Sequence, residues 1–128
     1  MVTFTSAELA YLASQRLGRL ATIDPSGTPQ NNPMAFSVAD DGTVRIGGYD
    51  LGRTRKFKNL AVHDRVSLVV DDIESVDPWK VRGVEIRGRA EALTDVEPAE
   101  VYLSREQIRI HPERIISWGV VESAPAAS

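Results

Sequence analysis

The chain of 128 residues contains no cysteine and only two histidines. Disulfide bonds, cysteine-based zinc sites and thiol nucleophiles are therefore excluded. His63 and His111 have neither the spacing nor the HExxH pattern of paired metal ligands, so the sequence predicts no metal site. No apolar run approaches the roughly 18–20 residues of a membrane span.

The N-terminus also lacks a basic segment followed by an apolar run, which is the pattern of a signal peptide. We therefore expect a cytoplasmic protein with no membrane partner. The net charge of −3 argues against nucleic acid as a partner, because domains that bind it carry a broad basic face. We expect one domain over residues 1–120, followed by a flexible tail at residues 121–128 that is small and polar in composition.

Local patterns predict a mainly β protein. Thr5-Ser6-Ala7-Glu8 has the form of a capping box, which starts a short helix ending near Gln15. Two further short helices are expected, one beginning near Arg53 and one over residues 95–106, and residues 72–80 are expected to form a polar loop. Apolar runs bounded by turn residues predict strands at residues 17–23, 28–38, 43–48, 65–71, 84–92, 107–111 and 114–118.

The closely spaced strands favour an antiparallel barrel over a sandwich. Pro29 and Pro33 cannot donate hydrogen bonds to a neighbouring strand, so the second strand is expected at an edge or partly bulged. The predicted fold class is a six-stranded antiparallel barrel with two or three short helices. Because so small a barrel has little interior room, a large ligand would lie outside it or between two subunits.

Residues 47–60 carry a concentration of positive charge on a chain that is acidic as a whole. Arg53, Arg55, Lys56 and Lys58 fall within six positions, and Gly47 and Gly48 just before them allow a ligand to approach the backbone closely. A helix beginning near Arg53 would direct Arg55 and Lys56 to one side, where a phosphate would be stabilised. A solvated cationic helix face is the alternative, and the pattern alone leaves both open.

Two consecutive amides, Asn31 and Asn32, precede Pro33 in the second strand. Because side chains alternate across a strand, one amide faces inward or toward a groove. An amide edge suits the donors and acceptors of a heterocycle, although an asparagine satisfying a bulge at Pro33 explains the pattern equally well. Trp79 and Trp118 stand at element ends, where each is suited to the core, to an interface or to covering a planar ring.

No catalytic nucleophile stands out, so the chemistry would come from a cofactor. Several segments in order resemble the pyridoxamine 5′-phosphate oxidase-like split-barrel family, which binds FMN or the deazaflavin F420. They are Arg19-Leu20-Ala21-Thr22-Ile23-Asp24, Gly27-Thr28-Pro29-Gln30-Asn31-Asn32-Pro33, Ile46-Gly47-Gly48, Arg55-Lys56-Phe57-Lys58-Asn59-Leu60 and the strand beginning at Arg65. Trp79, Arg82-Gly83-Val84-Glu85-Ile86-Arg87-Gly88 and the segment from Ile110 to Gly119 resemble its small actinobacterial, F420-dependent branch.

The resemblance implies a six-stranded split β-barrel that forms a homodimer with two cofactor sites at the subunit interface. It implies that Lys56 holds the cofactor phosphate with Arg55 beside it. The strand containing Asn31, Asn32 and Pro33 would run along the ring system, and Gly47 and Gly48 would lie near the phosphate. Trp79 and Trp118 would close the pocket of the other subunit.

The vitamin B6 oxidases of the family have a longer C-terminal part and an Arg and His substrate motif that this chain lacks, so oxidation of pyridoxamine phosphate is not expected. Arg53 and Lys58 favour F420 over FMN, because F420 carries a glutamate tail as well as a phosphate. The leading hypothesis is an F420-dependent oxidoreductase that transfers hydride to a small or planar unsaturated substrate. An FMN enzyme of the same fold and a non-catalytic cofactor-binding protein are the alternatives.

Overall fold

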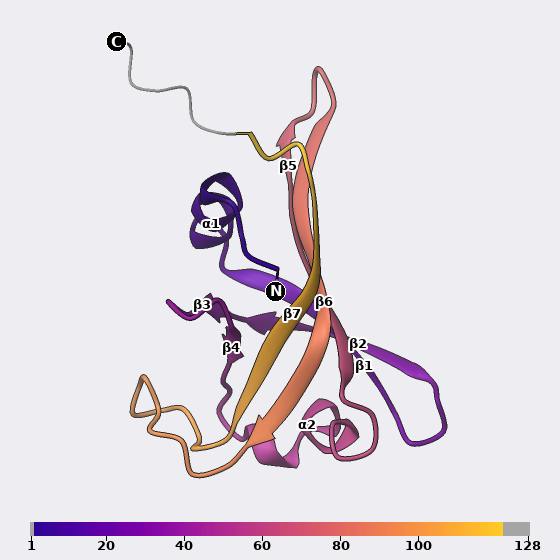
Figure 1. Ribbon diagram of the computed structural model, residues 1–128, viewed down its shortest axis with the longest axis vertical. Coiled ribbons are helices and arrows are strands. Elements are labelled where there is room, and N and C mark those ends of the chain that lie inside the picture. Colours follow the sequence, from indigo (N-terminus) through magenta and orange to yellow (C-terminus); the bar gives the residue numbers. More distant parts are fainter. Residues whose placement is uncertain (1, 122–128) are drawn as a thin grey trace.

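The computed structural model describes residues 2–121 as a curled antiparallel sheet with a helix toward each end (Figure 1). Residues 122–128, most of the predicted tail, lie outside the described residues. Within the described part, no helix is long and apolar enough to cross a membrane. The elements in chain order are α1 (Ser6–Ala13), β1 (Leu17–Ile23), β2 (Pro29–Ala35), β3 (Ser37–Val38), β4 (Val44–Ile46), the 3₁₀ helix η1 (Leu51–Arg53), α2 (Arg55–Asn59), β5 (Arg65–Ser75), β6 (Lys80–Leu93) and β7 (Gln107–Trp118).

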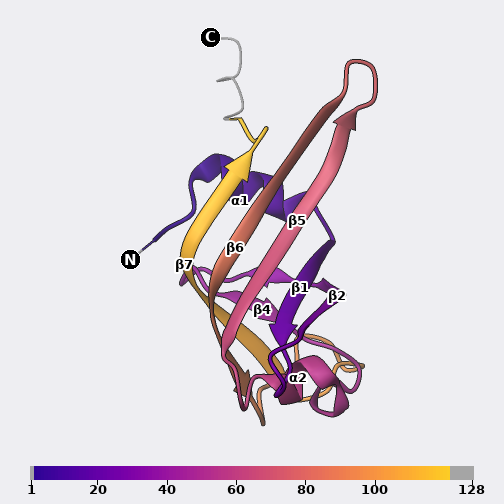
Figure 2. The same cartoon turned by 90° about the vertical axis from the view of Figure 1, so that its right-hand side faces the viewer.

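Seven strands pair in the order β2-β1-β5-β6-β7-β4-β3, and all the pairs are antiparallel. β2 and β3 lie at opposite edges of this sheet, although only Phe36 separates them in the chain. The sheet must therefore curl until its edges approach each other at Phe36, which makes a split barrel (Figure 2). The predicted fold class is confirmed, with Pro29 and Pro33 on an edge strand.

The strand expected over residues 28–38 breaks at Phe36 into β2 and β3, and counting the two separately gives seven strands where the fold class has six. The two strands expected at residues 107–111 and 114–118 are one continuous strand, β7. Pro112 is accommodated by a β-bulge, at which the pairing of β6 with β7 shifts between Arg87 and Gly88. A side chain at Gly88 would collide with the His111 carbonyl, 2.1 Å from an added Cβ, so the bulge requires glycine at this position.

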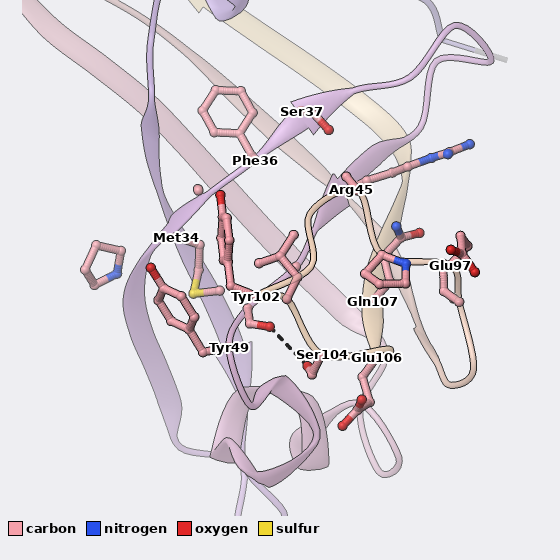
Figure 3. A pocket seen from close by; sticks show the side chains of 18 residues that line it. Met34, Phe36, Ser37, Arg45, Tyr49, Glu97, Tyr102, Ser104, Glu106 and Gln107 are labelled. Carbon is pink, nitrogen blue, oxygen red and sulfur yellow. Dashed lines mark hydrogen bonds between the residues drawn. The ribbon is translucent and has the colours of Figure 1, made fainter.

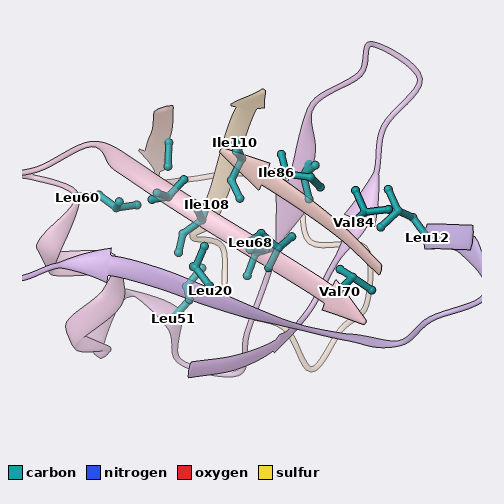
Figure 4. Close-up of a cluster of buried hydrophobic side chains, with 14 of the residues drawn as sticks. Leu12, Leu20, Leu51, Leu60, Leu68, Val70, Val84, Ile86, Ile108 and Ile110 are labelled. Atoms are coloured by element: carbon teal, nitrogen blue, oxygen red, sulfur yellow. The ribbon is translucent and has the colours of Figure 1, made fainter. Parts of the chain in front are cut away.

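The barrel core consists of branched apolar side chains that alternate with exposed ones along the long strands. Val84 and Ile86 of β6 lie beside Leu68 and Val70 of β5, and all four are fully buried (Figure 4). Further buried members of this cluster are Leu20, Val44, Ile46, Leu51, Ile108 and Ile110. On β6 the inward face is formed by Val84, Ile86 and Ala90, which are all buried.

Helix α1 begins at the predicted capping box, since Thr5 Oγ1 accepts from Glu8 N at 3.1 Å and Glu8 Oε1 accepts from Thr5 N at 2.8 Å. Buried Tyr11 fastens the helix to the sheet through its hydroxyl, 2.9 Å from Asp72 Oδ1 on β5. Arg82 on β6 donates to the same carboxylate from Nε at 2.8 Å and Nη2 at 3.1 Å. The hydrogen bonds from Arg82 hold the pKa of Asp72 below its ordinary value.

We expect Asp72→Asn to destabilise the protein by about 1 kcal/mol at pH 7, because asparagine cannot accept two charged hydrogen bonds from Arg82. A lowered carboxyl pKa stabilises the folded state above the unfolded pKa near 3.9, and this contribution is lost as pH falls through the lower folded value. The difference between wild type and variant should therefore shrink below about pH 4. Urea unfolding at pH 7 and pH 3 measures it. The control is Asp77→Asn, which changes an exposed carboxylate. If wild type and Asp72→Asn differ in free energy of unfolding by the same amount at both pH values, the expectation is wrong.

Residues 72–80, predicted as a loop, mostly extend the hairpin of β5 and β6 beyond the barrel (Figures 1 and 2). Cross-strand pairs continue to Ser75 and Lys80, and only residues 76–79 form the turn. This extension, the β5–β6 arm (residues 72–82), exposes four large apolar side chains: Ile73, Val76, Trp79 and Val81. The prediction was wrong because residues 72–80 are mostly polar and show no regular alternation. A strand pair that projects into solvent buries neither face, so it needs no such alternation.

The helix predicted over residues 95–106 is wrong. The segment consists of turns and bends, Asp95 has a φ of +60°, and the side chain of Val101 is 99% exposed. A helix there would have carried Val101, Tyr102 and Leu103 toward a core that the long strands already fill. The segment instead follows the surface of the barrel, with Val96 N bonded to Arg105 O at 2.8 Å.

Candidate functional site

A groove of about 690 Å³ opens where β2 passes into β3 (Figure 3). One wall is formed by residues 33–37, and the strand end at Arg45 and residues 47–49 continues it. The other wall is formed by residues 95–106, called the irregular segment below, together with the start of β7. It contributes residues 96–99, 102–104, 106 and 107. The groove therefore lies along the seam of the split barrel, on its outside, as expected for a ligand that so small a barrel could not enclose.

The irregular segment is held against the Gly47–Gly48 strand end by a compact set of hydrogen bonds. Ser104 N donates to Gly48 O at 2.8 Å, and Ser104 Oγ donates to the same oxygen at 3.0 Å. Ser104 Oγ also accepts from Leu51 N at 3.1 Å, and Glu106 Oε1 accepts from Gly52 N at 3.2 Å. These contacts fix the second wall of the groove and place η1 at one of its ends.

The groove offers flat apolar surfaces at this end. Tyr49 and Tyr102 face each other with ring centroids 5.6 Å apart, and Met34 lies beside them in Figure 3. Gly47 and Gly48 add backbone without side chains. Aromatic rings, a thioether and bare backbone suit a planar ring system. Tyr49, Tyr102 and Met34 were not among the predicted site residues, and the only sequence signal was the position of Tyr49 directly after Gly47 and Gly48.

The cationic residues 53–58 begin in η1 and continue into α2, which has Thr54 as its N-cap. Arg53 and Arg55 are exposed, and Arg53 Nε lies 3.5 Å from Asp50 Oδ2. Lys56 is half-buried, and burial lowers the pKa of its ammonium group. Within residues 2–121 no carboxylate lies within ion-pair distance of Lys56, so this partly desolvated cation is available to an anion. None of these cations lines the groove itself.

A buried amide network joins α2 to the strands that border the groove. Asn59 Nδ2 donates to Thr22 Oγ1 at 3.0 Å and to Gln30 Oε1 at 3.2 Å, and Gln30 Nε2 donates to Asn32 Oδ1 at 2.8 Å. Asn32 is thus the inward amide of the predicted pair, and Asn31 is exposed on the outer side. Sequence reasoning missed Asn59, which is only 1% exposed, because it lies inside a run of charged residues.

The structure distributes the predicted site residues over three places. Pro33, Gly47 and Gly48 line the groove, and the cations stand beyond the η1 end of it. Trp79 lies in the turn of the β5–β6 arm, and Trp118 ends β7 with its ring packed over Gly83. That arm and α2 are at opposite ends of the molecule in Figure 1. Within one chain, neither tryptophan is brought to the groove.

Comparison with known proteins gives a consistent result. The sequence profile described as pyridoxamine 5′-phosphate oxidase matches residues 4–123. The 5a,11a-dehydrotetracycline/5a,11a-dehydrooxytetracycline reductase of Streptomyces rimosus is 47% identical over 119 residues, which cover 91% of this chain and 84% of that protein. A conserved hypothetical protein of Mycobacterium tuberculosis is 26% identical, with a TM-score of 0.69 over 99% of this chain and 95% of that one.

A solved structure described as an F420 reductase shares the fold, with a TM-score of 0.68 and 24% identity over 88% of this chain and 98% of that one. The profile match spans nearly the whole chain, and the Streptomyces relative is similar over most of its own length. The chain therefore belongs to the pyridoxamine 5′-phosphate oxidase family and is an oxidoreductase with the split-barrel fold.

Proposed function

We propose that the protein is an F420-dependent reductase that transfers hydride from the reduced deazaflavin to a planar unsaturated substrate in the cytoplasm. The observation that carries the proposal is the seam groove, which has flat apolar walls and ends at η1, next to the unpaired, half-buried Lys56. A phosphorylated tricyclic cofactor needs a planar slot and an anion site side by side. The residues present fit both needs.

The predicted site residues near the groove and on α2 have roles in this proposal, except Asn32, whose amide oxygen is bonded to Gln30. Pro33, Gly47 and Gly48 would lie against the ring system, and Asn31 would face it from the outer side of β2. Lys56 would bind the phosphate with Arg55 beside it, and Arg53 would attract the acidic tail of F420. The bound cofactor supplies the hydride chemistry, while the chain's own residues hold and orient it.

The proposal includes a homodimer. The four exposed apolar side chains of the β5–β6 arm form a surface of the kind that marks protein contacts. A second copy of the chain would cover this arm and carry Trp79 and Trp118 to the other subunit's groove. This assignment gives the two tryptophans a role that they cannot have within one chain.

The substrate class is supported by the Streptomyces relative, whose name describes reduction of a dehydrogenated polycyclic compound. At 47% identity, we propose that this chain also reduces a conjugated polycyclic acceptor. An FMN enzyme of the same fold and a non-catalytic cofactor carrier remain the alternatives, because the family includes flavin as well as deazaflavin proteins.

The experiment mixes the purified protein separately with F420 and FMN, follows each by gel filtration, and records absorbance and molar mass of the eluted protein. We expect F420 to co-elute with a dimer and FMN not to. Reduced F420 and a panel of dehydrotetracyclines then test turnover through the rise in absorbance of oxidised F420. Co-elution of FMN alone would replace the proposal by the FMN enzyme. Binding of F420 without oxidation by any acceptor would replace it by the carrier, and co-elution of neither would reject both enzymes.

A further inference from the structure

The groove has a second, polar end that the proposed function does not use. Ser37, Arg45 and Gln107 line it, and Figure 3 shows them apart from Tyr49 and Met34. Ser37 pairs with Arg45 across β3 and β4, and Arg45 pairs with Arg109 across β4 and β7. Because Val44, Ile46, Ile108 and Ile110 fill the core side, this row of polar residues lies on the outer face.

Two arginines directly opposite each other on neighbouring strands repel, and here little compensates for the repulsion. The Nε atoms of Arg45 and Arg109 are both buried without an acceptor among the described residues. Asp41 Oδ2 is 3.7 Å from Arg45 Nη2, beyond hydrogen-bond distance, and Asp41 Oδ1 accepts from Thr43 Oγ1 at 2.7 Å and from Thr43 N at 3.0 Å.

The other carboxylates near this row are also engaged elsewhere. Glu91 is opposite Arg109 in the β6–β7 register but is bonded to His111 Nε2. Glu97 lines the same groove, and its carboxylate lies 4.0 Å from Arg105 Nη2. Among the described residues, the Arg45 guanidinium therefore has one anionic partner, Asp41 at 3.7 Å, and makes no hydrogen bond to a carboxylate. Its side chain remains 39% exposed in the groove.

Gln107, which also lines this end of the groove, has a free hydrogen-bond donor. Arg109 Nη2 donates to Gln107 Oε1 at 3.2 Å, which occupies the amide oxygen and leaves the amide nitrogen as a donor. The lining at one end of the groove thus includes a hydroxyl, a guanidinium and an amide nitrogen, whereas the other end is aromatic. Such a set of donors suits an ionised oxygen group.

We propose that Arg45, together with Ser37 and Gln107, binds an anionic oxygen substituent of the substrate, with Arg109 as a positioning residue behind Gln107. This inference rests on the proposed reductase function. It narrows the substrate to a planar conjugated acid, carboxylate or enolate, whose apolar body would extend along the groove from Arg45 toward the cofactor ring. Binding of the anionic group at Arg45 would set the orientation of the substrate along the groove.

Direct binding tests the inference without turnover. The probes are 2-naphthoate and its neutral isostere 2-naphthamide, titrated into the full chain preloaded with F420 and followed by ligand-observed NMR. We expect wild type to bind the acid about tenfold more tightly than the amide. Arg45→Met should abolish the preference, and Arg45→Lys should keep part of it. Arg114→Gln, which removes an exposed arginine from the same strand as Arg109, should leave it unchanged.

Thermal unfolding separates this role from a structural one. Because Arg45 lacks a buried acceptor and opposes another arginine, Arg45→Met should unfold at the same temperature as wild type or a few degrees higher. A clear decrease would make the arginine structural and overturn the inference, as would an undiminished preference for the acid in Arg45→Met.

The cofactor's own acidic groups are the competing source of an anion. If they bind here, Arg45→Met will weaken the binding of F420 itself, measured by quenching of F420 fluorescence, and the substrate inference fails. If F420 affinity is unchanged and only the preference for acidic over neutral acceptors falls, the inference stands. Failure of wild type to bind F420 would instead reject the proposed function on which the inference rests.

Discussion

Replacing Lys56 with alanine should weaken F420 binding about 10- to 100-fold, which corresponds to roughly 1.5–3 kcal/mol for a charge-assisted contact with phosphate. The physical reason is that Lys56 is half-buried with a lowered pKa and without a carboxylate partner in the described chain. A phosphate would restore the stabilisation that burial removes from the ammonium group. Titration with F420, followed by quenching of its fluorescence, gives the dissociation constant.

The matched control is Arg16→Ala, which removes one positive charge from an exposed position between α1 and β1, outside both the groove and the β5–β6 arm. Its affinity should stay within about twofold of wild type, because charges at that distance are largely screened at ordinary salt. Gel filtration should give both variants the elution volume of wild type. If Lys56→Ala binds F420 as tightly as wild type, the phosphate lies elsewhere, and the assignment of the cationic segment fails.

The second large effect is expected from Asn59→Ala, which should destabilise the protein by about 2–4 kcal/mol. Asn59 is buried between α2 and two strands, and its side chain donates to both Thr22 and Gln30. Truncation leaves these two oxygens without their donor and opens a cavity at the base of the helix that carries Lys56. F420 affinity should fall together with stability. Urea denaturation monitored by tryptophan fluorescence measures the change.

Asn31→Ala is the control for stability, because the exposed amide of Asn31 is absent from this network. Its free energy of unfolding should remain within about 0.5 kcal/mol of wild type. An Asn59→Ala protein as stable as Asn31→Ala would show that the network contributes nothing to stability. The attachment of α2 would then have to come from Leu60, which is buried in the core, and from Phe57, which packs against it.

Most of the strands could be predicted because alternation is a local property of the chain. β1, β4 and the inner face of β6 follow from apolar residues at every second position, and α1 follows from its capping box. β7 was divided in two because Pro112 disfavours a strand interior, and nothing local reveals the bulge that admits it. The irregular segment at 95–106 was mistaken for a helix because its anchoring partner, Gly48, is distant in sequence.

The candidate site was predictable only in part, for a similar reason. Pro33, Gly47 and Gly48 stood out as special backbone positions, and the structure places them in the groove. The aromatic residues Tyr49 and Tyr102 and the polar row around Arg45 become a site only when segments some 50–60 positions apart in sequence come together. The burial of Asn59 likewise depends on β1 and β2 and not on the charges around it.

The position of the groove on the barrel seam also has a consequence for the order of events during synthesis. Its walls come from residues 33–49 and 96–107, and β4, paired on one side with β3, finds its second partner in β7. Such distant pairings close late, because the loop between them must be ordered first. On the ribosome, the earlier hairpins are able to form while the chain grows, but the binding groove must wait until β7 has emerged. This oxidoreductase therefore acquires its ligand site only after β7 has been synthesised, and cofactor cannot serve as a template for the strands that precede it.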